Sequence, residues 1–177
     1  MEEKTKIRKE IAAAVARLTA EEKEAAAHAL VAKAALTTAQ PGVVAAYMPL
    51  PDELDTLPLL RALEQAGRRV VIPKVQGGEM DFYDYSEDTL ECGAWGIAEP
   101  VCAGAPVSPQ EIDLMFVPGR AFTAEGARLG RGKGFYDKYM SREGFRAHTV
   151  GVCYQCQMLD QIPTEPHDRR VDEVLAC

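Results

Sequence analysis

Apolar residues at helical spacing mark the first part of the chain. Four of them form one stripe and predict a helix over residues 4–18: Ile7, Ile11, Val15 and Leu18. Thr19 and Glu22 then match a capping box, in which a hydroxyl and a carboxylate together begin a helix. They predict a second helix that runs through an alanine-rich stretch to about residue 36.

Short apolar runs without polar alternation follow, which is typical of strands buried on both faces of a parallel sheet. They cover residues 43–47, 69–73, 113–118 and 149–154. Asp55 or Thr56 can cap a helix between the first two runs, with Pro58 in its first turn and Gly67 at its end. Strand, helix and strand in this order predict a βαβ unit.

The rest of the pattern is less regular. Residues 80–85 and 170–176 are further strand candidates, and residues 136–142 predict a short helix. Glycine and proline predict irregular chain over residues 90–109 and a loop over residues 119–134. Without a repeat or a linker, we expect residues 1–177 to form a single α/β domain. Its mostly parallel sheet should carry helices on both faces, in a three-layer α/β/α arrangement.

Charge and composition restrict the partners. The formal net charge of −7 excludes a global basic footprint for duplex nucleic acid. No apolar run reaches the roughly 20 residues of a membrane span. The acidic start at Glu2 and Glu3 lacks the apolar segment of a secretory signal. We therefore expect a cytoplasmic protein without nucleic-acid or membrane partners, and the expected state is a monomer.

The chain has five cysteines, an odd number that argues against a disulfide framework in the absence of a secretory signal. Cys153 and Cys156 form a C-x-x-C pair at the end of a predicted strand, whereas a redox pair is expected at a helix start. A zinc site needs a matching second pair that the sequence lacks. Buried, inert thiols are therefore favoured over a redox or a zinc site.

Candidate chemistry is concentrated in residues 118–134. This segment holds five of the chain's 14 glycines and four cations against one acid: Gly119, Gly126, Gly130, Gly132, Gly134, Arg120, Arg128, Arg131, Lys133 and Glu125. Alternating glycines let backbone N–H groups converge on an anion, and the helix N-terminus that follows adds positive charge. The segment therefore predicts a phosphate site at the carboxyl end of a parallel strand.

Common phosphate motifs do not fit this segment. Gly134 stands where a Walker A loop needs Ser or Thr after its lysine, here Lys133. The glycine spacing also fails the dinucleotide-binding pattern. A mobile surface loop with basic residues is the alternative interpretation.

Residues 128–137 read Arg-Leu-Gly-Arg-Gly-Lys-Gly-Phe-Tyr-Asp, which resembles the signature of the 5-formyltetrahydrofolate cyclo-ligase family, also called methenyltetrahydrofolate synthetases. Shorter matches extend the resemblance over nearly the whole chain: Lys4 with Arg8, residues 47–56, residues 95–100, residues 117–122, and His167 with Asp168. Two residues depart from the family pattern. Phe135 replaces a common tyrosine, and Arg120 stands where an apolar or small residue is frequent.

The resemblance implies an enzyme that uses ATP and Mg²⁺ to convert 5-formyltetrahydrofolate, with or without a polyglutamate tail, into 5,10-methenyltetrahydrofolate. ADP and phosphate are released. Phosphorylation of the formyl oxygen turns a poor leaving group into a good one, so that N10 of the folate can attack and close the ring. The protein then has to position the reactants and neutralise phosphoryl charge.

The resemblance also implies roles for residues of this chain. The ATP contacts would be Lys4, Arg8, Arg128, Gly130, Arg131, Gly132, Lys133, Gly134, Phe135, Tyr136 and Asp137. The folate contacts would be Met48, Glu53, Trp95, Arg131, Gly132, Lys133, Gly134 and Phe135. Arg131 and Lys133 would be catalytic, because they would stabilise the transferred charge. Asp137 and Asp168 would hold Mg²⁺.

These residues also have purely structural interpretations. They are a solvated helix face for Lys4 and Arg8, an ion pair for Arg128, a helix N-terminus for Asp137, a turn for Asp168, a surface acid for Glu53, and core packing for Met48 and Trp95. Rival functions are also open. They are a folate- or nucleotide-binding protein without turnover, a single-stranded RNA module, and an ATP-dependent ligase that acts on another amide.

Overall fold

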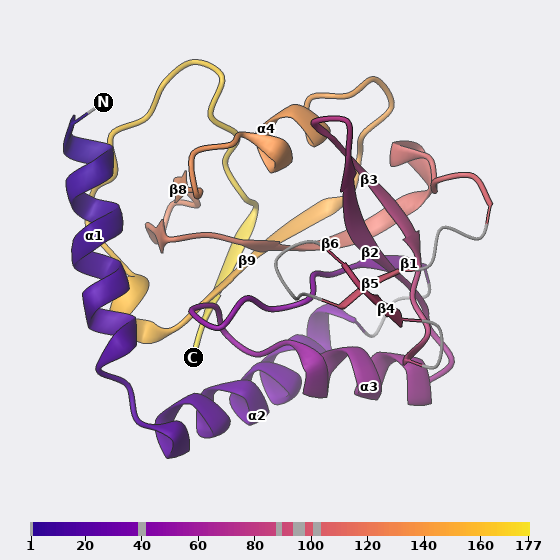
Figure 1. Ribbon diagram of the computed structural model, residues 1–177, viewed down its shortest axis with the longest axis horizontal. Coiled ribbons are helices and arrows are strands. Elements are labelled where there is room, and N and C mark those ends of the chain that lie inside the picture. The colour runs from indigo at the N-terminus through magenta and orange to yellow at the C-terminus, as the bar shows by residue number, and fades with distance from the viewer. Residues whose placement is uncertain (1, 39–41, 88–89, 94–97, 101–103) are drawn as a thin grey trace.

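The computed structural model of the chain describes residues 2–38, 42–87, 90–93, 98–100 and 104–177 (Figure 1). Its main sheet has six strands in the order β10-β9-β6-β1-β2-β3. Their bounds are β1 Val43–Ala45, β2 Arg69–Gln76, β3 Glu79–Asp84, β6 Ile112–Pro118, β9 His148–Cys153 and β10 Glu173–Ala176. Neighbouring strands are parallel except β2 and β3, which are antiparallel. The predicted α/β fold with a mostly parallel sheet is confirmed.

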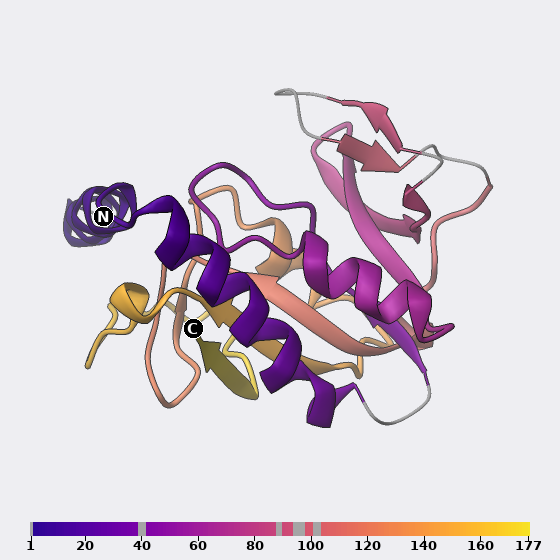
Figure 2. The same ribbon diagram turned by 90° about the horizontal axis from the view of Figure 1, so that it is seen from below.

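Helices α2 (Ala20–Thr37) and α3 (Leu57–Gln65) pack together over one face of the sheet (Figure 2). Leu30 of α2 and Leu60 of α3 are fully buried there against apolar strand residues such as Phe116. The predicted capping box begins α2, because the Thr19 hydroxyl accepts the N–H of Glu22 at 3.1 Å and the Glu22 carboxylate accepts the N–H of Thr19 at 2.8 Å.

Helix α1 (Glu2–Ala16) lies at the end of the sheet, against the short 3-10 turn η4 (Gln155–Gln157) that follows β9 (Figure 1). It buries Ile11 and Val15 in the same apolar core as α2 and α3. The predicted apolar stripe is thus the buried side of the helix. Its polar side carries the lysines and arginines, which remain available for other contacts.

The opposite face of the sheet is covered by the short helix α4 (Phe135–Tyr139) and the chain that follows it. Tyr139 packs edge-on against Phe82 of β3, with ring centroids 4.8 Å apart. Met140 and Ala147 join this second apolar core. Helices therefore lie on both faces, as predicted. The helix predicted over residues 136–142 is shorter, since it ends at Tyr139.

Three short pairings lie where the sequence predicts irregular chain. Strands β4 (Leu90–Cys92) and β5 (Ala98–Pro100) form an antiparallel pair, and Val107 bridges to Phe82 of β3. Within the glycine-rich loop, β7 (Ala121–Phe122) pairs with β8 (Arg128–Leu129). Strands of two or three residues are too short to show alternation, so their sequence gives no signal. No helix among the described residues is long and apolar enough to cross a membrane.

Candidate functional site

The carboxyl ends of three neighbouring parallel strands bring the candidate residues together. The loop of residues 48–56 follows β1, the glycine-rich loop of residues 119–134 follows β6, and Tyr154 follows β9. Ligands of open α/β sheets bind outside this edge. The Tyr154 hydroxyl donates to the carbonyl of Glu53 at 3.1 Å and ties the first loop to the third strand.

Backbone conformation explains three glycines of the loop. Gly126 has φ of +80°, and a Cβ there would lie 2.0 Å from the carbonyl oxygen of Val171. Gly132 and Gly134 have φ of +100° and +69°, so both occupy the left-handed region that other residues rarely adopt. Gly134 is also the residue that caps α4. The loop therefore delivers its last residues to a helix N-terminus, as the phosphate-site hypothesis requires.

Two basic residues of α1 contact segments that lie more than a hundred residues away in the sequence. Nε of Arg8 donates to the carbonyl of Gly130 at 2.8 Å. Nζ of Lys4 lies 2.6 Å from Asp168 Oδ2 and 3.4 Å from Glu165. Burial alone would lower the pKa of Lys4, but its contacts with Asp168 and Glu165 outweigh burial and raise that pKa. Arg8 thus contacts the glycine-rich loop and Lys4 pairs with acids of residues 165–168, so neither is merely a solvated cation.

Asp137, in the first turn of α4, joins two parts of the site. Its Oδ1 accepts Nη2 of Arg128 at 2.8 Å and the backbone N–H of Arg169 at 3.0 Å. Only 3% of the Arg128 side chain is exposed, so this residue forms the buried ion pair considered as its structural interpretation. Its guanidinium also lies 5.8 Å from the ring centre of Tyr136. Arg128 therefore anchors the loop to α4.

Both predicted magnesium ligands have carboxylate oxygens that fit a hard cation. Asp168 Oδ2 accepts Lys4 and the N–H of Glu165 at 2.8 Å, which leaves Oδ1 beside His167 Nε2 at 3.7 Å. Burial opposes ionisation of Asp168, but its hydrogen bonds with Lys4 and Glu165 dominate and lower its pKa. Within the described chain, Asp137 Oδ2 has no hydrogen-bond partner. Oxygen donors of this kind suit Mg²⁺.

Arg131 joins the glycine-rich loop to the loop after β1. Its Nε lies 2.9 Å from Glu53 Oε1, and its Nη2 pairs with Asp52. Nη1 of Arg120 lies 2.5 Å from the same Asp52 carboxylate. Burial would raise the pKa of Asp52, but Arg131 and Arg120 outweigh it and lower that pKa. Asp52 and Arg120 were not predicted as a pair, because the residues are 68 positions apart and no local pattern links them.

Lys133 stands apart from these ion pairs. It is exposed, and no described residue accepts a hydrogen bond or an ion pair from its ammonium group. Phe135 and Tyr136 pack against the second apolar core. The loop therefore presents one cation, Lys133, that the fold itself does not use. Trp95, predicted to contact folate, lies outside the described residues.

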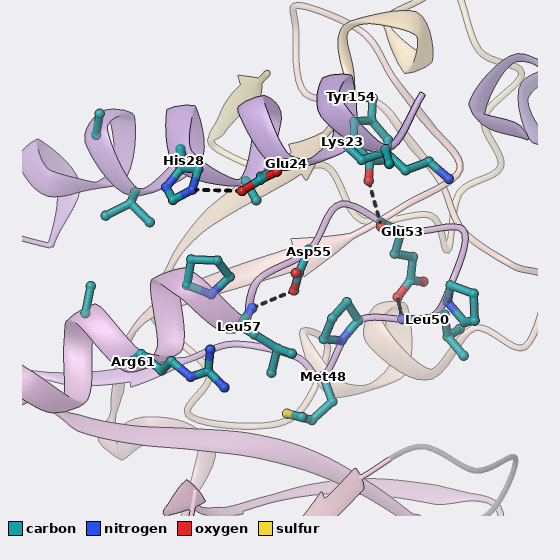
Figure 3. Close-up of a pocket in the computed structure, with 18 of the residues that line it drawn as sticks. Lys23, Glu24, His28, Met48, Leu50, Glu53, Asp55, Leu57, Arg61 and Tyr154 are labelled. Carbon is teal, nitrogen blue, oxygen red and sulfur yellow. Dashed lines mark hydrogen bonds and ion pairs between the residues drawn. The ribbon is translucent and has the colours of Figure 1, made fainter. Parts of the chain in front are cut away.

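A groove of about 1260 Å³ lies between α2, α3 and the loop of residues 48–56 (Figure 3). Met48 and Glu53, the two described residues predicted to contact only folate, both line it. Its walls are largely apolar, with contributions from Leu50 and Leu57. The Glu53 side chain is only 9% exposed, and its other oxygen accepts the N–H of Leu50 at 3.0 Å. Glu53 therefore borders both the groove and Arg131.

The C-x-x-C pair follows the inert interpretation. Cys153 is buried at the end of β9, and burial raises the pKa of its thiol to about 12. Its Sγ lies 3.7 Å from the sulfur of Met158. Cys156 lies in η4, and burial raises the pKa of this thiol too. Thiols of raised pKa are poor nucleophiles at neutral pH.

Comparisons with known proteins show the family and the fold of the chain. The model of the 5-formyltetrahydrofolate cyclo-ligase family matches residues 1–177. A 5-formyltetrahydrofolate cyclo-ligase of Mycolicibacterium smegmatis is 34% identical over 139 residues, which cover 75% of this chain and 72% of that protein. The solution structure of the 5,10-methenyltetrahydrofolate synthetase of Aquifex aeolicus has a TM-score of 0.86 and 32% identity, covering 98% of this chain and 89% of that one.

A second solved structure, a 5,10-methenyltetrahydrofolate synthetase of Mycoplasma pneumoniae, has a TM-score of 0.78 and 25% identity. It covers 97% of this chain and 96% of that one. The resemblance stated from residues 128–137 is thereby confirmed, and with it the α/β fold. The chain belongs to the 5-formyltetrahydrofolate cyclo-ligase family.

Proposed function

We propose that the protein converts 5-formyltetrahydrofolate into 5,10-methenyltetrahydrofolate with ATP and Mg²⁺, releasing ADP and phosphate. The observation that carries the proposal is Lys133, which has no partner among the described residues and lies in a glycine-rich loop that Arg8 of α1 and Asp137 of α4 flank. A protein that only stored folate would need neither a phosphoryl clamp nor carboxylates for a metal. Family membership supports the folate substrate.

The ATP phosphates would lie on residues 130–134. Gly132 and Gly134 leave room for close approach of an anion, and the N-terminus of α4 faces it. Arg8 holds the Gly130 carbonyl through Nε, so its Nη groups would be left to meet a phosphate. Lys4 and Arg128 would act on the phosphates indirectly, because each is already paired with a carboxylate: Lys4 with Asp168 and Arg128 with Asp137.

The reaction would proceed in two steps. The formyl oxygen attacks the terminal phosphorus of ATP, and the bond between that phosphorus and the ADP oxygen breaks. N10 of the folate then attacks the formyl carbon, the carbon–oxygen bond breaks, phosphate leaves and N10 loses its proton. Lys133 and Arg131 would stabilise the charge on the transferred group, since cations beside a phosphoryl group neutralise the negative charge that it carries in the transition state.

Asp137 and Asp168 would hold Mg²⁺ through the oxygens that their hydrogen bonds leave open. When bound, the ion neutralises charge on the phosphates. Glu53 would accept N–H groups at the edge of the pterin, and Met48 would form an apolar wall of the same groove. A polyglutamate tail, a monomeric state, a cytoplasmic location and a single domain over residues 1–177 remain predictions.

The direct test is absorbance in the near ultraviolet, because the methenyl product has a conjugated bridge that 5-formyltetrahydrofolate lacks. We expect the signal to need protein, ATP and Mg²⁺ together, and to disappear when EDTA replaces the metal. If ATP binds but no methenyl product forms, the phosphate site stands and the folate assignment is wrong. Another amide would then be the substrate.

A further inference from the structure

Carboxylates of the loop after β1 contact all three nitrogens of the Arg131 guanidinium. Its Nε lies 2.9 Å from Glu53 Oε1, its Nη2 pairs with Asp52 Oδ1, and its Nη1 lies 3.5 Å from Asp52 Oδ2. All three nitrogens therefore face carboxylate oxygens. A phosphate that uses the same planar fork must displace at least one carboxylate.

Arg120 competes with Arg131 for Asp52. Its Nη1 lies 2.5 Å from Asp52 Oδ2, closer than Nη1 of Arg131 lies to the same oxygen. This contact is an ion pair between the Arg120 side chain, which is only 15% exposed, and that of Asp52, which is 39% exposed. The competition leaves Arg131 with one close contact to Asp52 instead of two.

The backbone of Arg120 is fixed on both sides. Its N–H donates to the carbonyl of Leu129 at 2.6 Å. Its carbonyl accepts the buried amide of Gln157 at 3.0 Å. Arg131 lies between Gly130 and Gly132, and its side chain is held by the carboxylates of Asp52 and Glu53. Asp52 therefore bridges Arg131 and Arg120, a cation whose backbone is hydrogen-bonded on both sides.

We propose that Arg120 and Asp52 are positioning residues that set how readily Arg131 is released to the phosphates of ATP. This inference rests on the proposed function, because it takes ATP as the ligand of residues 130–134. Without Arg120, both oxygens of Asp52 are free to form a bidentate pair with the Arg131 guanidinium, which is stronger than a pairing through one oxygen. Without Asp52, only Glu53 holds Arg131.

The two substitutions should therefore change ATP affinity in opposite directions. Asp52→Asn should tighten ATP binding, because Arg131 loses a competing carboxylate and the site loses a negative charge. Arg120→Gln should weaken it, because Asp52 then holds Arg131 more firmly. The side chains of Arg131 and Asp52 are 33% and 39% exposed. Water screens such pairs, so each change should be about two- to fivefold.

The experiment is calorimetric titration of ATP with Mg²⁺ into the folded wild-type chain, Asp52→Asn, Arg120→Gln and the double variant. Glu125→Gln is the matched control. It removes an exposed acid between β7 and β8, close in sequence to Arg120, and its side chain has no partner among the described residues. Thermal unfolding of every variant separates an effect on binding from an effect on folding. The Kd of the control should stay within about 1.5-fold of wild type, as expected for a screened surface charge.

The double variant distinguishes the two ways in which Arg120 could act. If Arg120 acts through Asp52, Arg120→Gln has no further effect once Asp52→Asn is present. An equal loss of affinity in both backgrounds would mean that Arg120 meets the nucleotide directly, and would overturn the proposal. Unchanged or weaker binding by Asp52→Asn would overturn it too. Failure of the wild-type chain to bind ATP would refute the proposed function itself.

Discussion

Substitution of Lys133 tests the site most simply, because the fold makes no use of this side chain. Its ammonium group is exposed and has no ion pair or hydrogen bond with any described residue. Lys133→Ala should therefore change the free energy of unfolding by no more than about 0.5 kcal/mol, the usual range for such surface positions. For a chain of this size, that corresponds to a shift in Tm of at most about 2 °C.

Catalysis should respond very differently to the same substitution. Loss of one group that stabilises transition-state charge costs on the order of 10²- to 10³-fold in rate. If Lys133 acts on the transferred phosphoryl group, kcat should fall while the KM for folate changes little. Methenyl formation, followed by absorbance at saturating ATP and Mg²⁺, measures both constants.

Lys9→Ala provides the matched control, since Lys9 is also exposed and without a described partner but lies on α1 outside the proposed site. Its activity and Tm should both match wild type. Equal losses of Tm and activity in Lys133→Ala would show that the lysine supports the fold. Unchanged turnover would remove Lys133 from the mechanism.

Three further predictions concern the framework around the site. Lys4→Met should raise the lowered pKa of Asp168, measured by NMR titration. Lys4→Met should also lower the free energy of unfolding, measured in urea. This loss should be fully present above the ordinary Asp pKa of 3.8 and shrink as pH falls through the lowered pKa of Asp168, because the protonated carboxyl no longer pairs with Lys4 in the wild type. Gly126→Ala should lower the free energy of unfolding by more than about 2 kcal/mol, because the left-handed backbone is strained for alanine and the new Cβ would lie 2.0 Å from a carbonyl oxygen. Gly77→Ala is the control, since its backbone is also left-handed but the space around it is open. It should lower the free energy of unfolding by about 1 kcal/mol, measured for both variants by thermal unfolding. Cys153 should react with iodoacetamide only in denaturant, as read by mass spectrometry, since burial raises its pKa to about 12; labelling of the native chain at pH 7 would contradict this.

The sequence predicts most of the fold because local signals and tertiary packing agree. The capping box at Thr19 begins α2, and the apolar runs become the central parallel strands. The hairpin of β4 and β5 escaped prediction, because each strand has only three residues and glycines separate them. The end of α4 at Tyr139 is set by the packing of the chain that follows it, which local propensity does not record.

The site divides in the same way. Residues 128–137 are contiguous, so their motif can be recognised in the sequence alone. Two contacts depend instead on tertiary packing. Arg8 meets Gly130 because α1 packs beside the loop, and Arg131 meets Asp52 because the strands that precede their loops lie side by side. Strands β1 and β6 are neighbours in the sheet although nearly 70 residues separate them. Which residues meet across such a sequence separation depends on the order of the strands in the sheet, and the periodicity of a single sequence does not specify that order.

If the glycine-rich loop serves to transfer a phosphoryl group to the formyl oxygen, that oxygen must leave with the phosphate. The most direct test uses 5-formyltetrahydrofolate that carries ¹⁸O in the formyl group, in the presence of ATP and Mg²⁺. We expect one ¹⁸O atom in each phosphate released, read by mass spectrometry. Unlabelled phosphate, with the label in water, would mean that N10 attacks an unphosphorylated formyl group, and would refute phosphoryl transfer to the formyl oxygen.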